Sequence, residues 1–326
     1  MSDRLPWTNL HAQIHRTLRS RHLLPRDRRL LVAVSGGQDS LCLIKLLIDL
    51  QPKWGWFLAI AHCDHRWRDD SAANAQHVAN LAKTWAIPFY CATADRALNS
   101  EADARTWRYQ SLSAIARQHQ SAYIVTGHTQ SDRAETVLYN LIRGSGADGL
   151  QALTWQRDKG DRIQLVRPLL EVSRLTTAQF CQDMQLPIWE DATNQNLKYA
   201  RNRIRKELIP YLQNNFNPQV EQALAQTAEL LQADVEYLEF AAQQLKHQAT
   251  HPQEPLKLNR QILQAAPLAL QRRAMRQLLA QTLDRSPTFE QIEKLTALIT
   301  APNKAQTDPF PGGAIARVEQ GWIYIA

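Results

Sequence analysis

The chain has 326 residues, enough for two domains, and its 44 % hydrophobic and 21 % charged residues allow a packed core and exclude global disorder. No apolar run reaches ~20 residues and the first ten residues lack a secretory pattern, so we expect a cytoplasmic protein without membrane insertion. The four cysteines lie far apart, which argues against a disulfide scaffold and a zinc ribbon. The net charge of +7 is compatible with a nucleic-acid partner.

Strands and helices are expected to alternate over the first two-fifths of the chain. Short apolar runs predict strands at 29–35, 57–61, 89–92 and 123–126, and helical patterns follow at 40–50, 71–86, 101–118 and 132–143. This alternation predicts an α/β fold, a parallel sheet with helices on both faces. Ligands bind at the carboxyl ends of such strands, where polar residues and glycines stand at 35–37, 62–64 and 127–128.

The character of the sequence changes after Tyr211. The segment 213–218 is rich in Asn and contains Pro218, which is typical of a linker. Helical patterns then occupy 220–247, 268–283 and 289–300, and two short alternating runs around Gln320 and Gly321 predict a hairpin. We therefore expect one domain over 1–212, a linker over 213–218 and a mainly helical domain with a terminal hairpin over 219–326.

The segment Ser35-Gly36-Gly37-Gln38-Asp39-Ser40 stands between the first strand and the first helix. A turn at this place directs backbone N–H groups at one point, and the helix N-terminus adds partial positive charge, which suits a pyrophosphate. The two glycines let a ligand approach the backbone closely. Asp39 would repel phosphates unless a cation lies between them, so we expect it to bind Mg²⁺. A turn capped by Ser40 without any ligand is the alternative.

Further motifs follow in an order that resembles a known family. The segment SGGQDS resembles the loop of the N-type ATP pyrophosphatases, which split ATP between the α- and β-phosphates. The later motifs are HCDH at 62–65, EADARTWRY at 101–109, HTQSDRAET at 128–136, RGSG at 143–146, RPLL at 167–170, EDATN at 190–194 and RNRIR at 201–205. Together they are similar to the tRNA(Ile)-lysidine synthetases over roughly residues 28–212. EDATN followed by RNRIR is the most specific part.

The resemblance implies an ATP- and Mg²⁺-dependent ligase, with an ATP-pyrophosphatase catalytic domain over 1–212 and a tRNA-recognition domain over 219–326. Its partners would be L-lysine and an isoleucine tRNA with a CAU anticodon. Lysine would be joined to carbon 2 of the wobble cytidine through an adenylated tRNA intermediate, with AMP and pyrophosphate released. The modification would change the codon and amino-acid identity of the tRNA from Met to Ile. The implied ATP-binding residues are Ser35, Gly36, Gly37, Gln38, Asp39, Ser40, His62 and Asp64. The implied catalytic residues are Arg105, Arg108, Asp132 and Glu135, and the implied tRNA-binding residues are Arg143, Arg201, Asn202, Arg203 and Arg205.

Residue spacing is consistent with these roles. Arg105 and Arg108 lie three apart and face one way on a helix, where they could neutralise the α-phosphate or form a surface salt-bridge face. Asp132 and Glu135 are also three apart and could bind the lysine ammonium or take its proton, or only complement a helix dipole. The basic residues between 198 and 206 suit phosphate binding.

The sequence departs from the family pattern at Ser131, where an acid usually precedes Asp132. The chain also ends soon after one helical domain, so we expect a short form of the family, and a homodimer is left open. Three other functions stay open: a tRNA sulfur-transfer enzyme with the same loop, an ammonia- or glutamine-dependent nucleotide synthetase, and a non-catalytic RNA-binding module.

Overall fold

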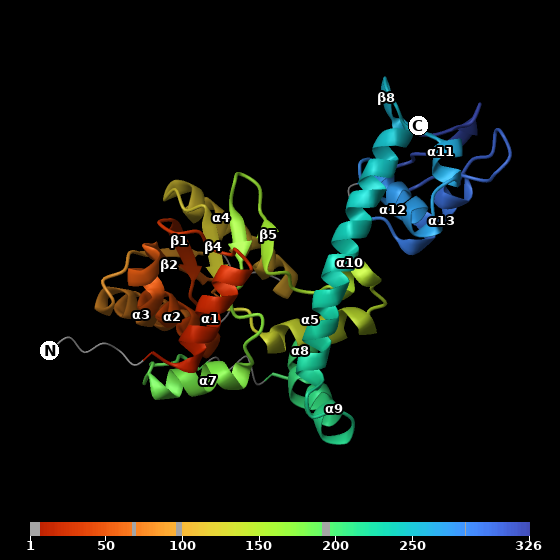
Figure 1. Ribbon diagram of the computed structural model, residues 1–326. Helices are drawn as coiled ribbons and strands as arrows, with labels where there is room; N and C mark the ends of the chain where they lie inside the picture. The colour runs from red at the N-terminus through yellow and green to blue at the C-terminus, as the bar shows by residue number, and fades with distance from the viewer. Residues whose placement is uncertain (1–6, 67–69, 96–99, 191–195, 284) are drawn as a thin grey trace. The chain divides into compact units, whose positions relative to one another are not determined.

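The computed structural model describes residues 7–66, 70–95, 100–190, 196–283 and 285–326, and Figure 1 traces the chain. The chain folds as two compact units, Met1–Leu230 and Leu231–Ala326. The long helix α10 (Val220–Ala249) contributes residues to both. Residues 191–195, which include most of the EDATN motif, lie outside the described part of the chain.

The first unit is built on one sheet. Its strands are β1 (Arg29–Ala33), β2 (Phe57–Asp64), β3 (Phe89–Thr93), β4 (Tyr123–Thr126), β5 (Gln156–Asp158) and β6 (Gln164–Val166). Their order is β3-β2-β1-β4-β6-β5, and all neighbours are parallel except β5 and β6. The predicted α/β fold is confirmed. The strand order reverses at β1, so the carboxyl ends of β1 and β4 border the crevice where such sheets bind ligands.

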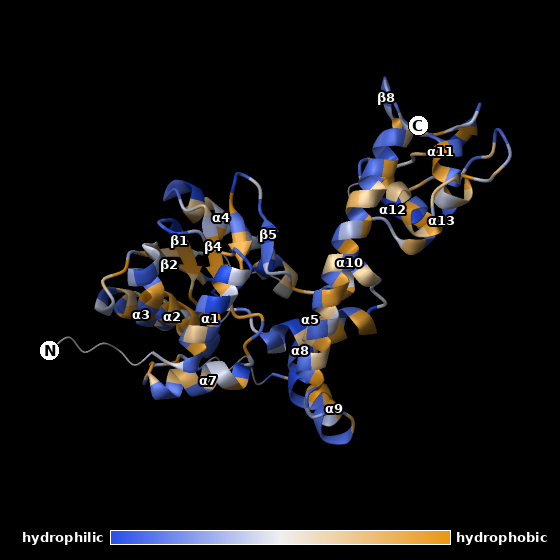
Figure 2. Ribbon diagram, viewed as in Figure 1, coloured by the Kyte–Doolittle hydropathy of each residue, from blue (hydrophilic) through white to orange (hydrophobic). Residues whose placement is uncertain are grey.

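Helices cover both faces of this sheet (Figure 1). The helices of this unit that precede α10 are α1 (Asn9–Ser20), α2 (Gln38–Trp54), α3 (Ser71–Thr84), α4 (Glu101–Gln118), α5 (Gln130–Ile142), α6 (Ala147–Leu150), α7 (Arg174–Asp183), α8 (Ala200–Arg203), the π-helical turn η2 (Ile204–Leu208) and α9 (Ile209–Asn215). Leu30 and Val32 join the apolar cluster formed with α1, α2, α3 and α7, whereas Leu31 joins the cluster formed with α4. The central strands β1, β2 and β4 are accordingly mostly apolar, as Figure 2 shows, whereas β5 at the sheet edge is polar and exposed.

The predicted linker at 213–218 belongs to the first unit. Its first residues complete α9, and the start of α10 packs with α5 and η2 through Val220, Leu224 and Leu138. Ser131 on α5 also donates a hydrogen bond to Glu221 on α10 at 2.6 Å. The compact first unit therefore continues to Leu230.

The second unit combines helices with a small sheet. Strands β7 (Thr250–His251), β8 (Glu254–Asn259), β9 (Ala316–Glu319) and β10 (Trp322–Ile325) form an antiparallel sheet in the order β7-β8-β10-β9. Helices α11 (Arg260–Gln264), α12 (Leu268–Leu279) and α13 (Phe289–Ala297) share its apolar core. The predicted hairpin is confirmed as β9 and β10, but β8 completes a sheet that the sequence did not indicate. Among the described helices, none is long and apolar enough to cross a membrane.

Candidate active site

The loop from Ser35 to Gly37 connects β1 to the N-terminus of α2. Ser40 fixes its shape, because its hydroxyl accepts a hydrogen bond from the Ser35 N–H at 3.2 Å and donates one to the Gly37 carbonyl at 2.8 Å. Gly37 is the N-cap of α2 and provides no side-chain cap. The N–H groups in the first turn of a helix have no partner within the helix. Those of α2, starting at Gln38, are therefore suited to an anion.

The conformation of this loop requires a glycine at position 36. Gly36 has φ +89°, and a Cβ atom there would lie 2.5 Å from the Asn74 amide oxygen and 3.2 Å from Trp189 Cβ. Asn74 also donates to the Ser35 carbonyl at 3.0 Å, and the Trp189 N–H donates to the Gly36 carbonyl at 2.9 Å. Residues from α3 and from the segment after α7 therefore hold the loop, and neither contact was expected from the sequence.

The end of β4 lies directly against the start of α2. A Cβ atom at Gly127 would lie 2.8 Å from the Asp39 carbonyl oxygen and 3.1 Å from the Ser40 nitrogen. A glycine at this position lets two backbone segments meet. It brings α5, which begins three residues later at Gln130, beside the loop.

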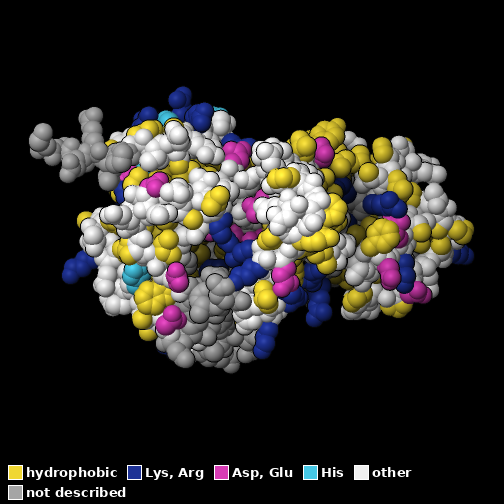
Figure 3. Space-filling view, turned by 90° about the horizontal axis from the view of Figure 1, so that it is seen from below, with side chains coloured by type: hydrophobic (Ala, Val, Ile, Leu, Met, Phe, Trp, Pro, Cys, Tyr) yellow, Lys and Arg dark blue, Asp and Glu magenta, His cyan; other side chains and the backbone are white. Residues whose placement is uncertain are grey.

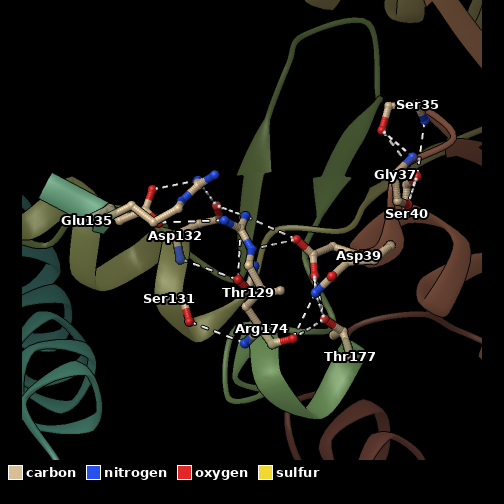
Figure 4. A network of polar contacts seen from close by, with 12 residues as sticks. Ser35, Gly37, Asp39, Ser40, Thr129, Ser131, Asp132, Glu135, Arg174 and Thr177 are labelled. Carbon is tan, nitrogen blue, oxygen red and sulfur yellow. Dashed lines mark hydrogen bonds and ion pairs between the residues drawn. The ribbon is translucent and has the colours of Figure 1, made fainter. Parts of the chain in front are cut away.

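Asp39 projects from the first turn of α2 towards α7 (Figure 4). Its Oδ1 accepts a hydrogen bond from the Thr177 hydroxyl at 2.5 Å, and its Oδ2 accepts one from Arg174 Nε at 3.1 Å. Gln38 supports this arrangement by donating to the Thr177 hydroxyl at 3.0 Å and to the Arg174 carbonyl at 2.8 Å. Asp39 is thus held by α7, a helix that the sequence did not predict.

Three carboxylates and two guanidinium groups form one charged cluster, shown in Figure 4; its members are Asp39, Asp132, Glu135, Arg174 and Arg205. Arg174 Nη2 lies 3.1 Å from Asp39 Oδ2 and 3.0 Å from Asp132 Oδ1. Arg205 binds Glu135 through two hydrogen bonds of 2.5 and 2.8 Å. The structure therefore brings together the predicted Asp39, Asp132 and Glu135. With every member ionised, the cluster carries one net negative charge.

Burial affects the carboxylates of this cluster unequally. Removal from water raises the pKa of Asp39 despite the nearby Arg174, and it raises the pKa of Glu135 despite the pairing with Arg205. Burial also opposes the ionisation of Asp132, but Arg174 and other donors outweigh it and lower the pKa of that group. A further positive charge at this place would consequently stabilise the ionised forms of Asp39 and Glu135.

Ser131 does not face this cluster. Its hydroxyl donates to Glu221 and accepts from the Arg174 backbone N–H at 3.2 Å. It joins α5 to α7 and α10. Ser131, where this sequence departs from the family motif, thus holds neighbouring helices together.

A second, basic group of side chains surrounds Tyr109 on α4. Arg105 Cζ and Lys159 Nζ lie 5.2 and 4.7 Å from the ring centroid, and the buried Arg167 interacts with the same tyrosine. Removal from water and the charge of Arg167 lower the pKa of His128 to about 3, so this imidazole is neutral at pH 7. Arg108 Nε donates to His65 Nε2 at 3.1 Å, just after the end of β2, and the charges of Arg105 and Arg108 also lower the pKa of His128.

Two further residues predicted to bind ATP, His62 and Asp64, lie at the carboxyl end of β2. His62 is buried and its Nδ1 lies 2.8 Å from the Val34 carbonyl. Asp64 is also buried and accepts a hydrogen bond from the Arg66 N–H at 2.8 Å. Both shape the backbone next to the loop, and direct contact with ATP stays a prediction.

The residues predicted to bind tRNA occupy different places. Arg143 is exposed at the end of α5 and donates to the Tyr139 hydroxyl at 2.8 Å. Asn202 is buried and donates to the Asn196 carbonyl, and Arg203 donates to the Leu197 and Lys198 carbonyls. Arg205 pairs with Glu135 in the carboxylate cluster and keeps 27 % of its side chain exposed, and its contact with tRNA stays a prediction. Figure 3 shows Lys and Arg side chains gathered around a hollow on this side of the first unit, with acidic side chains within it.

Sequence reasoning missed Arg174, Thr177 and Asn74. Arg174 and Thr177 follow Ser173, which caps α7 by accepting the Thr176 N–H, so an N-cap signal was present. No local pattern indicates that α7 would contact Asp39, because Arg174 and Thr177 follow Asp39 by 135 and 138 positions in the sequence.

Comparison with known proteins assigns the chain to a family. Residues 7–212 match the model of the PP-loop domain, and residues 258–324 match that of the TilS substrate binding domain. The tRNA(Ile)-lysidine synthase of Nostoc sp. is 70 % identical over 98 % of this chain and 97 % of its own length. The chain belongs to the tRNA(Ile)-lysidine synthase family.

More distant relatives agree with this assignment. The enzyme of the same name from Synechocystis sp. is 51 % identical over 98 % of both chains, and the chloroplastic one from Zygnema circumcarinatum is 36 % identical over 90 % of this chain and 81 % of its own. A solved U34-tRNA thiolase, NcsA from Methanococcus maripaludis, has a TM-score of 0.59 at 16 % identity, covering 68 % of this chain and 77 % of that one. That likeness shows the shared fold alone.

Proposed function

We propose that the chain joins L-lysine to carbon 2 of the wobble cytidine of an isoleucine tRNA with a CAU anticodon, using ATP. Membership of the tRNA(Ile)-lysidine synthase family supports this function. The observation that carries it is the pairing of two sites at one sheet edge. The anion-binding loop at 35–40 lies beside a carboxylate cluster suited to a cationic amine.

The loop and the first turn of α2 bind the phosphates of ATP. Their free N–H groups and the hydroxyl of Ser35 supply donors, and the helix N-terminus supplies partial positive charge. Mg²⁺ is commonly bound by one or two carboxylates together with substrate phosphates, and Asp39 fits this requirement. When bound there, the ion would neutralise phosphate charge and assist the departure of pyrophosphate.

The first step is adenylation of the cytidine. Its carbonyl oxygen attacks the α-phosphorus, an O–P bond forms, and the bond to pyrophosphate breaks. Arg105 and Arg108, both on α4, neutralise the charge that develops on the α-phosphate. Neutral His128, whose pKa responds to both arginines and to Asp132, can donate or accept a hydrogen bond without adding charge.

The second step is the attack of the lysine ε-amine on carbon 2, which breaks the bond to oxygen and releases AMP. The amine must first lose the proton of its ammonium form. Asp132 and Glu135 bind this ammonium, and Glu135, with its raised pKa, is the better proton acceptor of the two. Both carboxylates lie on one side of α5, directed at the cluster.

This function is tested by offering the purified chain ATP, labelled lysine and a CAU-anticodon tRNA transcript. We expect tRNA-dependent pyrophosphate release and one lysine incorporated per AMP formed. The matched control is the same transcript with another base at the wobble position, which has no cytidine to modify. Equal turnover with both transcripts, or pyrophosphate release without lysine incorporation, would contradict the proposed function.

A further inference from the structure

The Arg174 side chain lies in the middle of the carboxylate cluster, where the proposed function places substrate cations (Figure 4). Its Nη2 contacts Asp39 and Asp132 at 3.1 and 3.0 Å, and its Nη1 lies 3.8 Å from Glu135. One guanidinium group thus bridges the carboxylate assigned to Mg²⁺ and the two assigned to the lysine ammonium. Nothing in the sequence motifs assigned a role to this arginine.

The backbone of Arg174 is fixed, whereas its side chain can leave. The backbone N–H donates to Ser131, and the carbonyl accepts from Gln38 at 2.8 Å. The side chain keeps 28 % of its surface exposed, about as much as the 27 % of Arg205. Rotation of the side chain into solvent therefore requires no movement of α7.

The two arginines of the cluster are held differently. Arg205 forms a two-pronged pair with Glu135, which is the stronger arrangement for a guanidinium and a carboxylate. Arg174 divides its nitrogen atoms between Asp39 and Asp132 and completes no such pair. Of the two, Arg174 is the one that a competing cation can replace more easily.

A substrate cation cannot bind the same oxygen atoms while Arg174 remains. Asp39 Oδ2 already accepts from Arg174, and Asp39 Oδ1 accepts from Thr177. A second positive charge on these oxygen atoms would lie within about 4 Å of the guanidinium and be repelled by it. Binding of a cation and withdrawal of Arg174 are thus coupled.

We propose that Arg174 is an internal counter-cation: it neutralises Asp39 and Asp132 in the resting enzyme and withdraws when a substrate cation binds. This inference rests on the proposed function, because it uses the roles given there to the carboxylates. It makes Arg174 a positioning residue that keeps buried carboxylates paired before the substrates arrive. The binding-competent state is the one in which Arg174 has withdrawn. The apparent Kd for the cation equals the intrinsic Kd divided by the fraction of molecules in that state.

The test measures cation binding without ATP or tRNA. Wild type and Arg174→Ala are titrated with MgCl₂ alone and with L-lysine alone, and binding is followed by calorimetry and by the shift of the thermal unfolding midpoint. If Arg174 occupies the site in ~90 % of molecules, its removal tightens binding of the competing cation about tenfold. The arm that responds identifies that cation. Methylguanidinium, which imitates the missing side chain, should bind to the Arg174→Ala variant and displace the bound cation from it.

Two controls make the result decisive. Arg117 lies on α4 and forms an exposed ion pair with Asp161. Arg117→Ala therefore removes an equal charge far from the cluster, and this variant should bind both cations as wild type does. Arg174→Gln keeps the length of the side chain without its charge and replaces the alanine variant if that one fails to fold. Unchanged or weaker binding of both cations in the Arg174 variants would overturn the inference. Lysidine formation by wild type tests the proposed function separately, so the two failures are distinguishable.

Discussion

Asp39 connects the phosphate loop to the charged cluster. It stands in the first turn of α2, and both of its oxygen atoms face α7 through Thr177 and Arg174. We predict that Asp39→Asn leaves the fold intact and slows adenylation by ~10²-fold or more, the loss seen when one electrostatic contact to a transition state is removed. Single-turnover formation of adenylated tRNA measures this, and near-normal rates would contradict the metal role.

A second buried carboxylate, Asp49, has a structural role at the other end of α2. It pairs with Lys45 at 2.5 Å and with His11 on α1 at 3.0 Å. Burial opposes its ionisation, but these two partners outweigh burial and lower the pKa of Asp49. Asp49→Asn should therefore reduce the free energy of unfolding by about 1–3 kcal/mol at neutral pH.

The lowered pKa also predicts how this difference depends on pH. Ionised Asp49 stabilises the folded state fully above its unfolded pKa of 3.8, and this contribution disappears as the pH falls through the lower folded value. Urea unfolding of wild type and Asp49→Asn should show a gap that is largest above about pH 5 and closes below pH 3.8. A gap that widens in acid would refute the assigned pairing.

At the residue scale the sequence indicates the acids better than their partners. Asp39, Asp132 and Glu135 lie in recognisable motifs, and the structure brings them into one cluster. Arg174 lies in no motif singled out from the sequence. Arg205 was expected to bind tRNA but pairs with Glu135, since η2 packs against α5. Such pairings depend on tertiary packing, which residue spacing alone does not reveal.

At the scale of elements, the loop after β1 depends on what surrounds it. Gly36 combines a positive φ with close neighbours, whereas Gly37 has φ −77° and its nearest neighbour for a Cβ would be Ser35 Oγ at 3.6 Å. We predict that Gly36→Ala lowers the free energy of unfolding by about 1–3 kcal/mol, because a strained conformation and a clash would coincide. The unfolding midpoint without ATP measures the effect.

Gly37→Ala is the matched control within the same loop. Its backbone conformation suits any residue, so its free energy of unfolding should stay within about 0.5 kcal/mol of wild type. Equal destabilisation by both substitutions would show that loss of loop flexibility, and not the clash with Asn74, governs this position.

Elements with a strong local pattern were predicted well. The strands at β1 to β4 and the helices between them were expected, because apolar runs and helical periods alternate there. Strands β6 and β8 were not, since each depends on pairing with a distant strand, β4 for β6 and β10 for β8. Their existence is decided by the sheet, not by their own residues.

At the scale of the whole molecule, the basic charge is only partly free to bind tRNA. Arg272, Arg273 and Arg276 pair with Glu293 or Glu239 in the second unit. Lys198 and Arg201 make no ion pair within the described residues; Lys198 precedes α8 and Arg201 lies within it. These two are therefore the better candidates for contacts with the tRNA backbone.

Salt dependence of tRNA binding tests this assignment. Replacing both Lys198 and Arg201 with Ala should weaken binding and reduce the slope of log K against log salt by roughly 1.5, at 0.7–0.9 for each phosphate contact. Binding of ATP should not change. Arg117→Ala, which removes one paired surface charge, should leave the slope as in wild type. An unchanged slope in the double variant would mean that other residues hold the backbone.

The most direct test of the two-site account separates the two chemical steps in Asp132→Asn. A single-turnover experiment follows labelled AMP on the tRNA and labelled lysine in parallel. If Asp132 serves the lysine amine, adenylated tRNA should form at nearly the wild-type rate and accumulate, while lysine transfer slows by ~10²-fold. Ser131→Ala should affect either step less, because the Ser131 hydroxyl contacts Glu221 and the Arg174 backbone and no carboxylate of the cluster. Loss of adenylation in Asp132→Asn would contradict the account and assign this carboxylate to the ATP site.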